Sequence, residues 1–241
     1  MNHGIHIAAA GMKSRMQALD VSANNLANVN TVGFKKDSVF YGIFNRVQGT
    51  SLEKALADST VIERVQTDFT VGPMIQTGNA LDLALPAEGF FVVRTPDGDR
   101  YTRNGEFTLN GQREIVNAQG FPVLGERGPL VVPEGEVQVG ESGDVSIEGA
   151  TVGRLQIVHF EDTSLLRKVG GVLFEALPQA VETRPLRLMV KQGFLEGSNV
   201  NPMQGVSDAI LNMRNFEMLS RALRSLSEEV NRRVIEEVGR V

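Results

Sequence analysis

The first part of the chain carries a helical pattern of apolar side chains between Asn2 and about Asn28. The apolar positions recur at intervals of three and four, which is close to the spacing of a coiled-coil seam. They are Ile5, Ala8, Met12, Met16, Leu19, Ala23 and Leu26. Lys13 and Arg15 lie off this stripe, and no proline interrupts it. We therefore predict a long amphipathic helix in this region.

A second apolar row of the same kind runs from about Met203 to the end of the chain. Its positions repeat at threes and fours over roughly eight turns. They are Val206, Ile210, Met213, Phe216, Leu219, Leu223, Leu226, Val230 and Val234. Asn199 or Asn201, followed by Pro202, makes a good helix start, and Gly239 is a natural stop. The sequence therefore predicts a long C-terminal helix.

The residues between the two predicted helices follow a different pattern. From 72 to 191, short apolar runs such as Phe90–Val93 alternate with turn-forming dipeptides such as Asn110-Gly111. This pattern is typical of an antiparallel β domain, and it lacks the alternation of strands and helices found in nucleotide-binding α/β sheets. Residues 36–71 are weakly patterned. We expect mixed or extended structure there, with one or two helical turns at Ser51–Leu56.

Together these patterns predict an α+β fold class: long N- and C-terminal helices that form a paired, coiled-coil-like core region, with a central antiparallel β-rich domain. The predicted boundaries are 1–35 for the N-terminal helix and its Asn-rich turn, 36–71 for the linker, 72–191 for the β-rich domain and 192–241 for the C-terminal helix. The two stripes would cover each other, but a two-helix pair leaves apolar surface facing outward. Such surface is typical of a subunit whose partner is another copy of itself.

Composition and charge narrow the function classes. The 241 residues have a formal net charge of −5 with both signs mixed along the chain, so no basic field is available to bind nucleic acid. The absence of cysteine excludes disulfides, thiolate metal sites and cysteine nucleophiles. A cleavable secretory signal is not expected, because the apolar run Ile5–Met12 is short and leads directly into Lys13. No window approaches the ~18–20 apolar residues of a membrane span.

The polar residues form no strong catalytic or metal-binding pattern. His3 and His6 could face a metal together on a helix, but no third ligand is near them in the sequence. His159 has Asp162 and Ser164 nearby, although no Gly-x-Ser-x-Gly elbow accompanies them. We therefore predict no enzyme activity, no metal and no cofactor. A secreted β-rich binding module of the adhesin kind and a small hydrolase built around His159 are the alternatives.

The segment after the first predicted helix is unusual. It reads SANNLANVNTVGFK and includes Asn24, Asn25 and Asn28. Asparagine side chains weaken a helix and bond backbone groups at its end. Gly33, followed by Phe34, provides a permissive backbone where the chain reverses. We predict that this Asn-rich turn fixes the bend at which the chain leaves the helix; an ordinary helix C-cap and loop is the alternative.

This segment, extended to SANNLANVNTVGFKK, closely resembles the N-terminal motif of the flagellar basal-body rod and hook proteins. Three further blocks continue the resemblance in chain order. QTGNALDLA followed by GFF (76–84 and 89–91) is similar to the entry into the family's β domain, YTRNGEF (101–107) to its internal motif, and QGFLEGSNVN (192–201) to the segment before its last helix. The motif positions singled out in the later blocks are Arg103, Asn104, Gly105, Gly193, Gly197 and Asn199.

Within this family, subunits of the proximal rod and of the distal rod are the most similar. The strings DFTVGP (68–73) and VGRL (152–155) and the short linker between Lys36 and Asp68 resemble the proximal-rod type. The string MRNFE (213–217) departs from the distal-rod pattern. These features favour the proximal rod, and the distal rod is the alternative.

The resemblance implies a structural subunit that assembles helically through its terminal helices into the torque-transmitting shaft for motility, within the periplasmic space. The implied partners are copies of the chain itself, other flagellar rod subunits and the flagellar type III export apparatus, with no nucleic acid and no direct membrane span. We assign the subunit interface to apolar side chains of both predicted helices. These are Ile5, Met12, Met16, Leu19, Leu26, Ile210, Met213, Leu219, Leu223, Leu226 and Val230.

Overall fold

The computed structural model describes residues 2–42 and 61–238 of the chain. The chain forms two compact units. The helical unit consists of Met1–Ala27, Asp37–Gln66 and Asn201–Val241, and the β unit consists of Asn28–Lys36 and Thr67–Val200. The chain therefore crosses between the units four times, after residues 27, 36, 66 and 200.

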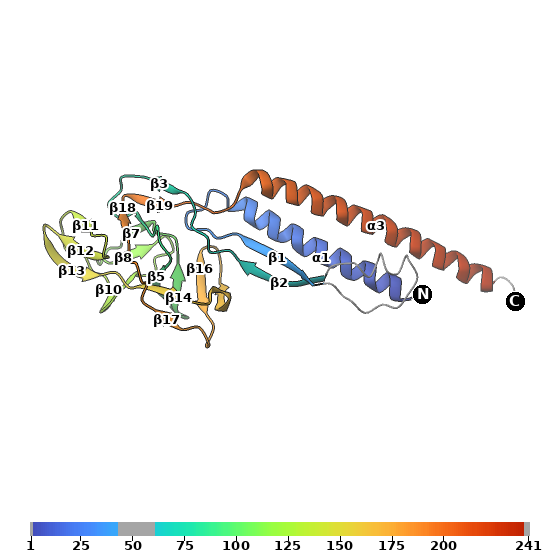
Figure 1. Ribbon diagram of the computed structural model, residues 1–241, viewed down its shortest axis with the longest axis horizontal. Helices are drawn as coiled ribbons and strands as arrows, with labels where there is room; N and C mark the ends of the chain where they lie inside the picture. The colour runs from blue at the N-terminus through green and yellow to red at the C-terminus, as the bar shows by residue number, and fades with distance from the viewer. Residues whose placement is uncertain (1, 43–60, 239–241) are drawn as a thin grey trace. The chain divides into compact units, whose positions relative to one another are not determined.

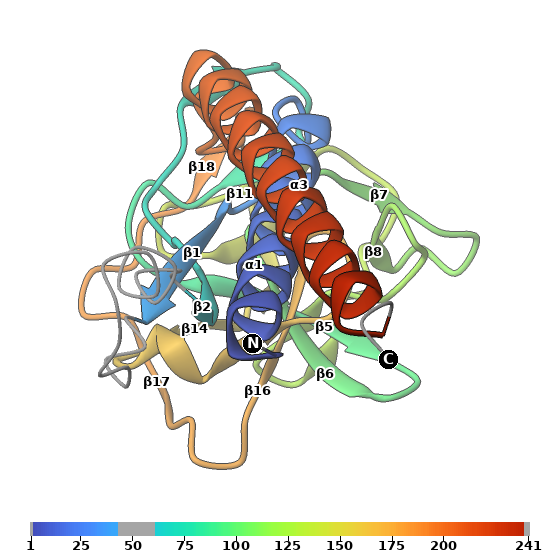
Figure 2. The same cartoon turned by 90° about the vertical axis from the view of Figure 1, so that its right-hand side faces the viewer.

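The helical unit contains two long helices that lie side by side (Figure 1), and Figure 2 views the pair from the end where both chain termini lie. They are α1 (Asn2–Ala27) and α3 (Pro202–Val238). A two-stranded sheet of β1 (Asp37–Gly42) and β2 (Val61–Thr67) belongs to the same unit, and β1 contacts α1. The predicted helical turns at Ser51–Leu56 lie outside the described residues.

The start of α3 is set by a side-chain cap. The Oδ1 atom of Asn201 accepts hydrogen bonds from the main-chain N–H groups of Met203 at 3.0 Å and Gln204 at 3.2 Å. Pro202 follows as the first helical residue, where its missing N–H costs nothing. The prediction of a helix start at Asn201-Pro202 is therefore confirmed. The predicted stop at Gly239 lies outside the described residues.

The prediction of a paired, coiled-coil-like core is wrong. In the described part of α1 the buried face contains the small residues Ser14 and Ala18, whereas Met16 is 56% exposed. In α3, Ile210 and Met213 are 47% and 55% exposed. Small side chains form the buried face of α1, and a pair of helices has too little surface to enclose the larger side chains beside it. The α+β class with an antiparallel β-rich centre fits the structure, but the coiled-coil-like seam does not.

The row of α3 that lies against α1 differs from the predicted row in its first half. Gly205 lies next to the Leu26 side chain. From Gly205, half-buried positions continue at intervals of four and three. They are Ala209, Asn212, Phe216, Leu219 and Leu223. Because this row faces α1, the predicted positions Val206, Ile210 and Met213 turn toward solvent instead.

The largest sheet of the β unit has six strands among the described residues, in the order β15-β16-β6-β5-β14-β17. Neighbouring strands in this sheet pair in the antiparallel direction. The strands are β5 (Phe90–Thr95), β6 (Gly98–Thr102), β14 (Ile157–Phe160), β15 (Leu166–Lys168), β16 (Leu173–Ala176) and β17 (Glu182–Thr183).

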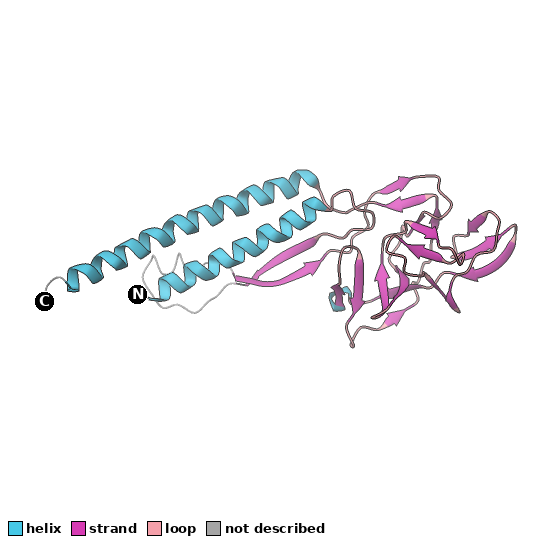
Figure 3. Cartoon of the chain, turned by 180° about the vertical axis from the view of Figure 1, so that it is seen from behind, coloured by secondary structure: helices cyan, strands magenta, loops and turns pink. Residues whose placement is uncertain are grey.

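Figure 3 draws the strands of the β unit in magenta, and the unit also contains smaller antiparallel sheets: β11-β12-β13, and the pairs β19-β3, β18-β4, β7-β8 and β10-β9. Their strands are β3 (Met74–Gln76), β4 (Leu83–Ala84), β7 (Phe107–Leu109), β8 (Ile115–Asn117), β9 (Leu124–Gly125), β10 (Gly128–Pro129), β11 (Val137–Val139), β12 (Asp144–Ile147), β13 (Ala150–Arg154), β18 (Lys191–Gln192) and β19 (Phe194–Glu196). A short 3-10 helix, η1, spans Thr163–Leu165.

Two apolar cores stabilise the β unit, and β5 separates them. Successive side chains of a strand point to opposite faces. Phe91 and Val93 therefore join the larger core, while Phe90 and Val92 join the second one. The predicted strand at Phe90–Val93 is confirmed, and its lack of polar residues reflects burial on both faces. A third, small cluster contains Phe34, Val172 and Val200.

Candidate functional site at a buried ion pair

The sequence motifs lead to a buried ion pair in the β unit. Lys35 comes from the Asn-rich segment and Glu196 is the last residue of β19; their side chains form an ion pair and both are 0% exposed. Lys35 Nζ also donates a hydrogen bond to the main-chain carbonyl of Thr70 at 2.6 Å. A buried charge pair is tolerated only when its remaining donors and acceptors are also satisfied. Neighbouring segments supply these partners.

Glu196 binds three other segments of the β unit through different atoms. Its Oε1 accepts a hydrogen bond from the Gly72 N–H at 2.8 Å, and its Oε2 lies 3.3 Å from Arg103 Nη1. Its main-chain carbonyl accepts a hydrogen bond from the Gly33 N–H at 2.7 Å. Glu196 therefore binds the Asn-rich segment, the chain that enters β3 and the internal motif YTRNGEF (101–107), which we call the central motif.

Arg103 brings the central motif to the same place and is 2% exposed. Its Nη1 also donates to the main-chain carbonyls of Leu85 at 3.1 Å and Ala87 at 2.9 Å, and its guanidinium lies 5.2 Å from the centre of the Phe90 ring. Its Nε has no hydrogen-bond partner among the described residues. Two cations thus share one carboxylate, and carbonyl dipoles and a ring face offset the excess positive charge.

Burial of two neighbouring cations shifts the pKa values of both side chains. Burial lowers the pKa of Lys35 from its ordinary value, and the attraction of the Glu196 carboxylate opposes this effect only in part. Burial also lowers the pKa of Arg103, again partly offset by Glu196. The nearby Arg103 charge lowers the pKa of Lys35 further. The Glu196 carboxylate therefore favours the charged form of both buried cations.

Two glycines allow the segments to approach each other this closely. Gly33 has a φ of 69° and lies against the backbone of Arg103 and Asn104. Gly72 lies against the carbonyl oxygen of Gly197. A Cβ atom at either position would stand far inside van der Waals contact with main-chain atoms that cannot move independently. The motifs therefore touch backbone to backbone at these two points.

Asn199 ties further main-chain groups together beside the ion pair. Its Oδ1 accepts a hydrogen bond from the Lys36 N–H at 2.8 Å. Its Nδ2 donates to the carbonyl of Asp68 at 2.8 Å and to Thr70 Oγ1 at 3.1 Å. A single amide therefore links residues next to three of the four crossing points, those after 36, 66 and 200.

Phe34 anchors the Asn-rich segment on the other side of Lys35. Its ring is 1% exposed and packs with Val172 and Val200. Lys168 Nζ lies 4.3 Å from the ring centre and donates a hydrogen bond to the carbonyl of Lys35 at 2.7 Å. An ammonium over an aromatic face is an attractive arrangement, and here it also covers the ring.

The remaining glycines of the last motif join it to the block that enters the β domain. The Gly193 N–H donates to the carbonyl of Asp82 at 2.8 Å, and the Gly197 N–H donates to the carbonyl of Pro73 at 2.8 Å. The blocks at 76–84 and 192–201, which are far apart in the sequence, therefore lie side by side as β19-β3 and β18-β4.

Asn104 and Gly105 complete the turn that follows Arg103. Asn104 Oδ1 accepts a hydrogen bond from the Glu106 N–H at 2.8 Å, and the carbonyl of Gly105 accepts one from the Leu83 N–H at 3.0 Å. This turn holds the Arg103 side chain in its buried position and attaches the central motif to β4.

The Asn-rich segment makes local bonds as well. In the helical unit, Asn25 Oδ1 accepts from the Asp37 N–H at 2.9 Å and Asn25 Nδ2 donates to the Asp37 carbonyl at 2.8 Å. In the β unit, Asn28 Oδ1 accepts from Thr31 Oγ1 at 3.1 Å. Asn24 is exposed in the last turn of α1. The bonds of Asn25 fix where the chain returns after the excursion of residues 28–36.

We use the name buried junction for Gly33, Lys35, Thr70, Gly72, Arg103, Glu196 and Asn199. Sequence reasoning singled out Gly33, Arg103 and Asn199 but missed the ion pair itself. A signal was present: Glu196 is the only charged residue between Lys191 and Asp208, in a segment rich in glycine and apolar residues. An isolated charge in such a segment indicates a buried partner.

The predicted interface residues occupy several environments. Met16, Ile210 and Met213 are exposed, Met12, Leu19, Leu26, Leu219 and Leu223 are half-buried, and the side chains of Ile5, Leu226 and Val230 lie outside the described part. The exposed apolar side chains of α3 gather on its first half, in what we call the outer patch. It consists of Met203, Val206, Ile210, Leu211, Met213 and Met218. Several exposed apolar side chains on one stretch of helix are typical of an interaction surface.

The residues considered for catalysis have other partners. His159 Nδ1 lies 3.7 Å from Glu88 Oε2. Asp162 Oδ1 accepts hydrogen bonds from the N–H of Ser164 at 2.9 Å and from its Oγ at 2.6 Å, and so caps η1. The described residues contain no cluster of three potential metal ligands, and none of their helices is long and apolar enough to span a membrane. The side chains of His3 and His6 lie outside the described part.

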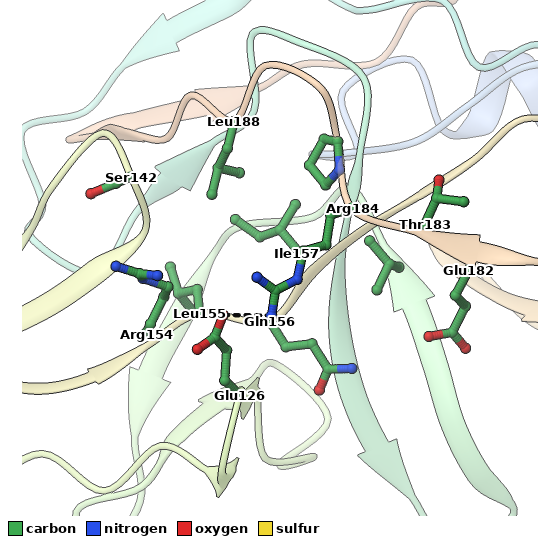
Figure 4. Close-up of a pocket in the computed structure, with 12 residues that line it drawn as sticks. Glu126, Ser142, Arg154, Leu155, Gln156, Ile157, Glu182, Thr183, Arg184 and Leu188 are labelled. Carbon is green, nitrogen blue, oxygen red and sulfur yellow. Dashed lines mark hydrogen bonds and ion pairs between the residues drawn. The ribbon is translucent and has the colours of Figure 1, made fainter.

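A surface pocket of the β unit is shown in Figure 4. Arg184 reaches over its apolar floor of Leu155 and Ile157 and forms an ion pair with Glu126 at 3.3 Å. Arg154 and Glu182 also line the pocket. The charged side chains of the lining balance one another, so the pocket favours neither an anion nor a cation.

Comparison with known families gives three matches along the chain. The model for "Flagella basal body rod protein" matches residues 5–35, that for "Flagellar hook protein FlgE/F/G D1 domain" residues 84–147, and that for "Flagellar basal body rod FlgEFG protein C-terminal" residues 191–229. Lys35, Arg103 and Glu196 fall one in each matched region. The buried ion pair therefore joins the first and the last of these regions, and Arg103 joins the middle region to the same carboxylate.

Whole-length relatives agree with these matches. The flagellar basal-body rod protein FlgF of Caulobacter vibrioides is 31% identical over 100% of both chains, and that of Salmonella typhimurium is 33% identical over 96% of this chain and 97% of the relative. The rod protein FlgG of Borreliella burgdorferi is 31% identical over 93% of this chain and 95% of the relative. The chain belongs to the flagellar basal-body rod protein family.

Proposed function

We propose that this protein is a non-enzymatic structural subunit of the bacterial flagellar rod. It assembles with copies of itself and with other rod subunits, and the resulting shaft transmits torque. Family membership supports the class of function. The outer patch of α3 supports assembly, because it leaves apolar side chains in water that a neighbouring subunit would cover.

The exposure of the side chains of the outer patch is the observation that carries the proposal. Met203 is 79% exposed, Met218 is 59% exposed and Ile210 is 47% exposed. Burying one such side chain fully is worth roughly 1.5–3 kcal/mol. Several of them together offset the loss of translational and rotational freedom on association, which costs about 4–15 kcal/mol.

Within the rod we propose the proximal type. The FlgF relatives of Caulobacter vibrioides and Salmonella typhimurium align over 100% and 96% of this chain, and the FlgG relative of Borreliella burgdorferi aligns over 93%. The strings DFTVGP and VGRL also resemble the proximal-rod type. The similar identities of the two groups make a distal-rod subunit the second candidate.

The proposed location is the part of the rod that crosses the periplasm, and the proposed route is the flagellar type III export apparatus. Both follow from the resemblance to the family. An epitope-tagged chain should be recovered in purified basal bodies and should stay in the cytoplasm of cells that lack the export apparatus. Recovery outside the cytoplasm of such cells would contradict the route.

Assembly through the outer patch is tested by adding charge to it. Ile210→Asp with Met213→Asp should abolish concentration-dependent association in sedimentation velocity and fibre formation in electron micrographs. Ala222→Asp with Ser225→Asp is the matched control, because both positions are exposed, have the same spacing and receive the same charge. Equal association of both variants would remove the outer patch from the mechanism.

A further inference from the structure

The segment Gly33-Phe34-Lys35 fits the β unit as a bound peptide fits its receptor. Each residue meets a different feature of the surrounding chain. The Gly33 N–H bonds to the Glu196 carbonyl, the Phe34 ring lies beneath the Lys168 ammonium, and the Lys35 ammonium meets the Glu196 carboxylate. Main-chain bonding combined with side-chain pockets is the usual basis of peptide recognition.

The β unit has its own cores without this segment. The two larger apolar cores contain no residue from 28–36, and the six-stranded sheet is formed by strands between Phe90 and Thr183. Only the small cluster of Val172 and Val200 includes Phe34. The packing that stabilises most of the β unit therefore does not depend on the segment.

The receptor side of the site also keeps partners of its own. With the segment absent, the Glu196 carboxylate would retain Arg103 Nη1 at 3.3 Å and the Gly72 N–H at 2.8 Å. A buried carboxylate with a cation and a main-chain donor is not an orphaned charge. Arg103 in turn retains the carbonyls of Leu85 and Ala87. The site can persist empty, ready to accept a lysine.

We infer that the β unit carries a peptide-binding site for a glycine–aromatic–lysine segment, filled in cis by residues 33–35, whose docking is a step separate from the folding of the β unit. The geometry sets the specificity at each position. The first residue has no room for a Cβ, the second is a buried ring and the third is an ammonium between two oxygen acceptors. This inference does not depend on rod assembly.

Hydrogen exchange on the full chain tests whether docking is separate. Lys35→Met should accelerate exchange of the Gly33 and Lys36 amides together, by roughly tenfold or more, because these two amides bind the segment to Glu196 and Asn199. The Val93 amide in the six-stranded sheet should keep its protection. Lys36→Met is the matched control, since the Lys36 side chain forms a partly exposed ion pair with Asp68, and it should leave all three amides near their wild-type rates.

Two exchange results would overturn the inference. One is that the junction amides and the sheet amide accelerate by the same factor, which would make docking part of global folding. The other is that the junction amides exchange at wild-type rates in Lys35→Met. Should Lys35→Met fail to fold, wild-type exchange at rising denaturant decides the question, because a separate step requires the junction amides to open before the Val93 amide.

A binding experiment tests the site itself. A full chain with Gly33→Val and Phe34→Ala cannot dock its own segment, because a Cβ at Gly33 meets the Arg103–Asn104 backbone. A fluorescent synthetic peptide of residues 28–37 should bind this variant saturably. The same peptide with Lys35→Met should bind at least about tenfold more weakly, since it leaves the carboxylate without its ammonium. Equal binding of both peptides, or no binding of either, would contradict a lysine-specific site.

Discussion

Lys35 and Glu196 are 161 positions apart in the sequence and share an ion pair from which solvent is fully excluded. Lys35 lies one residue before the chain crosses to the helical unit, and Glu196 lies four residues before the crossing that leads into α3. Because of this placement, the ion pair ties together the two stretches of chain that lead to these crossings. Through this pair, the first and the last of the family motifs are bonded to each other.

The first prediction concerns the close approach at Gly72. Gly72→Ala should lower the free energy of unfolding by about 1–3 kcal/mol, because the added Cβ would push against the carbonyl of Gly197. Gly111→Ala is the control: a Cβ there meets nothing within 4 Å, so the change should stay within about 1 kcal/mol. Urea unfolding measures both. Similar losses at the two positions would show that the approach at Gly72 is not tight.

The second prediction concerns acid stability. Burial raises the pKa of Asp68, but hydrogen bonds from Thr70 and the pairing with Lys36 outweigh it and leave this pKa below its ordinary value of 3.8. Between the two values the unfolded chain binds more protons, so stability rises with pH there. The contribution of Asp68 is thus present above pH 3.8 and is lost as pH falls through the lowered pKa.

Asp68→Asn removes this titration. The stability of the variant should therefore fall less steeply with acidification than that of the wild type, in urea unfolding across about pH 2–5. Two curves that stay parallel over this range would mean that Asp68 has the same pKa in the folded and unfolded chains.

The third prediction concerns the Asn25 amide, which bonds both main-chain groups of Asp37. Asn25→Ala should lower the free energy of unfolding of the helical unit by about 1–3 kcal/mol, since two partly buried bonds are lost together. Asn30→Ala, at an exposed position, should change it by less than about 0.5 kcal/mol. Circular dichroism during thermal unfolding follows the helices directly. A loss at Asn30 as large as that at Asn25 would refute a specific role for the amide.

The helices and strands could be predicted from sequence patterns better than the contacts between them could. The strand at Phe90–Val93 and the helix start at Asn201 follow from local chemistry, an apolar run in one case and a side-chain cap in the other. The faces along which the helices pack do not follow from local chemistry. The stripe through Met16 marked apolar positions, but the buried side of α1 contains Ser14 and Ala18. Hydrophobic periodicity marks apolar positions but does not show that small side chains such as Ser14 allow two helices to approach.

The buried junction was accessible from the sequence only in part. Motif resemblance pointed to Arg103 and Asn199 without saying what they bind. Nothing in the sequence distinguishes Lys35 from its neighbour Lys36, and only the fold places the two in different environments. Burial of a charge depends on a partner that is distant in sequence, here Glu196, and no local pattern encodes that distance.

The central claim is that the ion pair of Lys35 and Glu196 holds the family motifs together, and a double-mutant cycle measures it most directly. Lys35→Met and Glu196→Gln, alone and combined, should give a coupling energy of about 2–3 kcal/mol in equilibrium unfolding. The same cycle on the partly exposed pair of Lys36 and Asp68, with Lys36→Met and Asp68→Asn, should give less than about 1 kcal/mol. A coupling near zero for Lys35 and Glu196, or one no larger than that of the exposed pair, would contradict the claim.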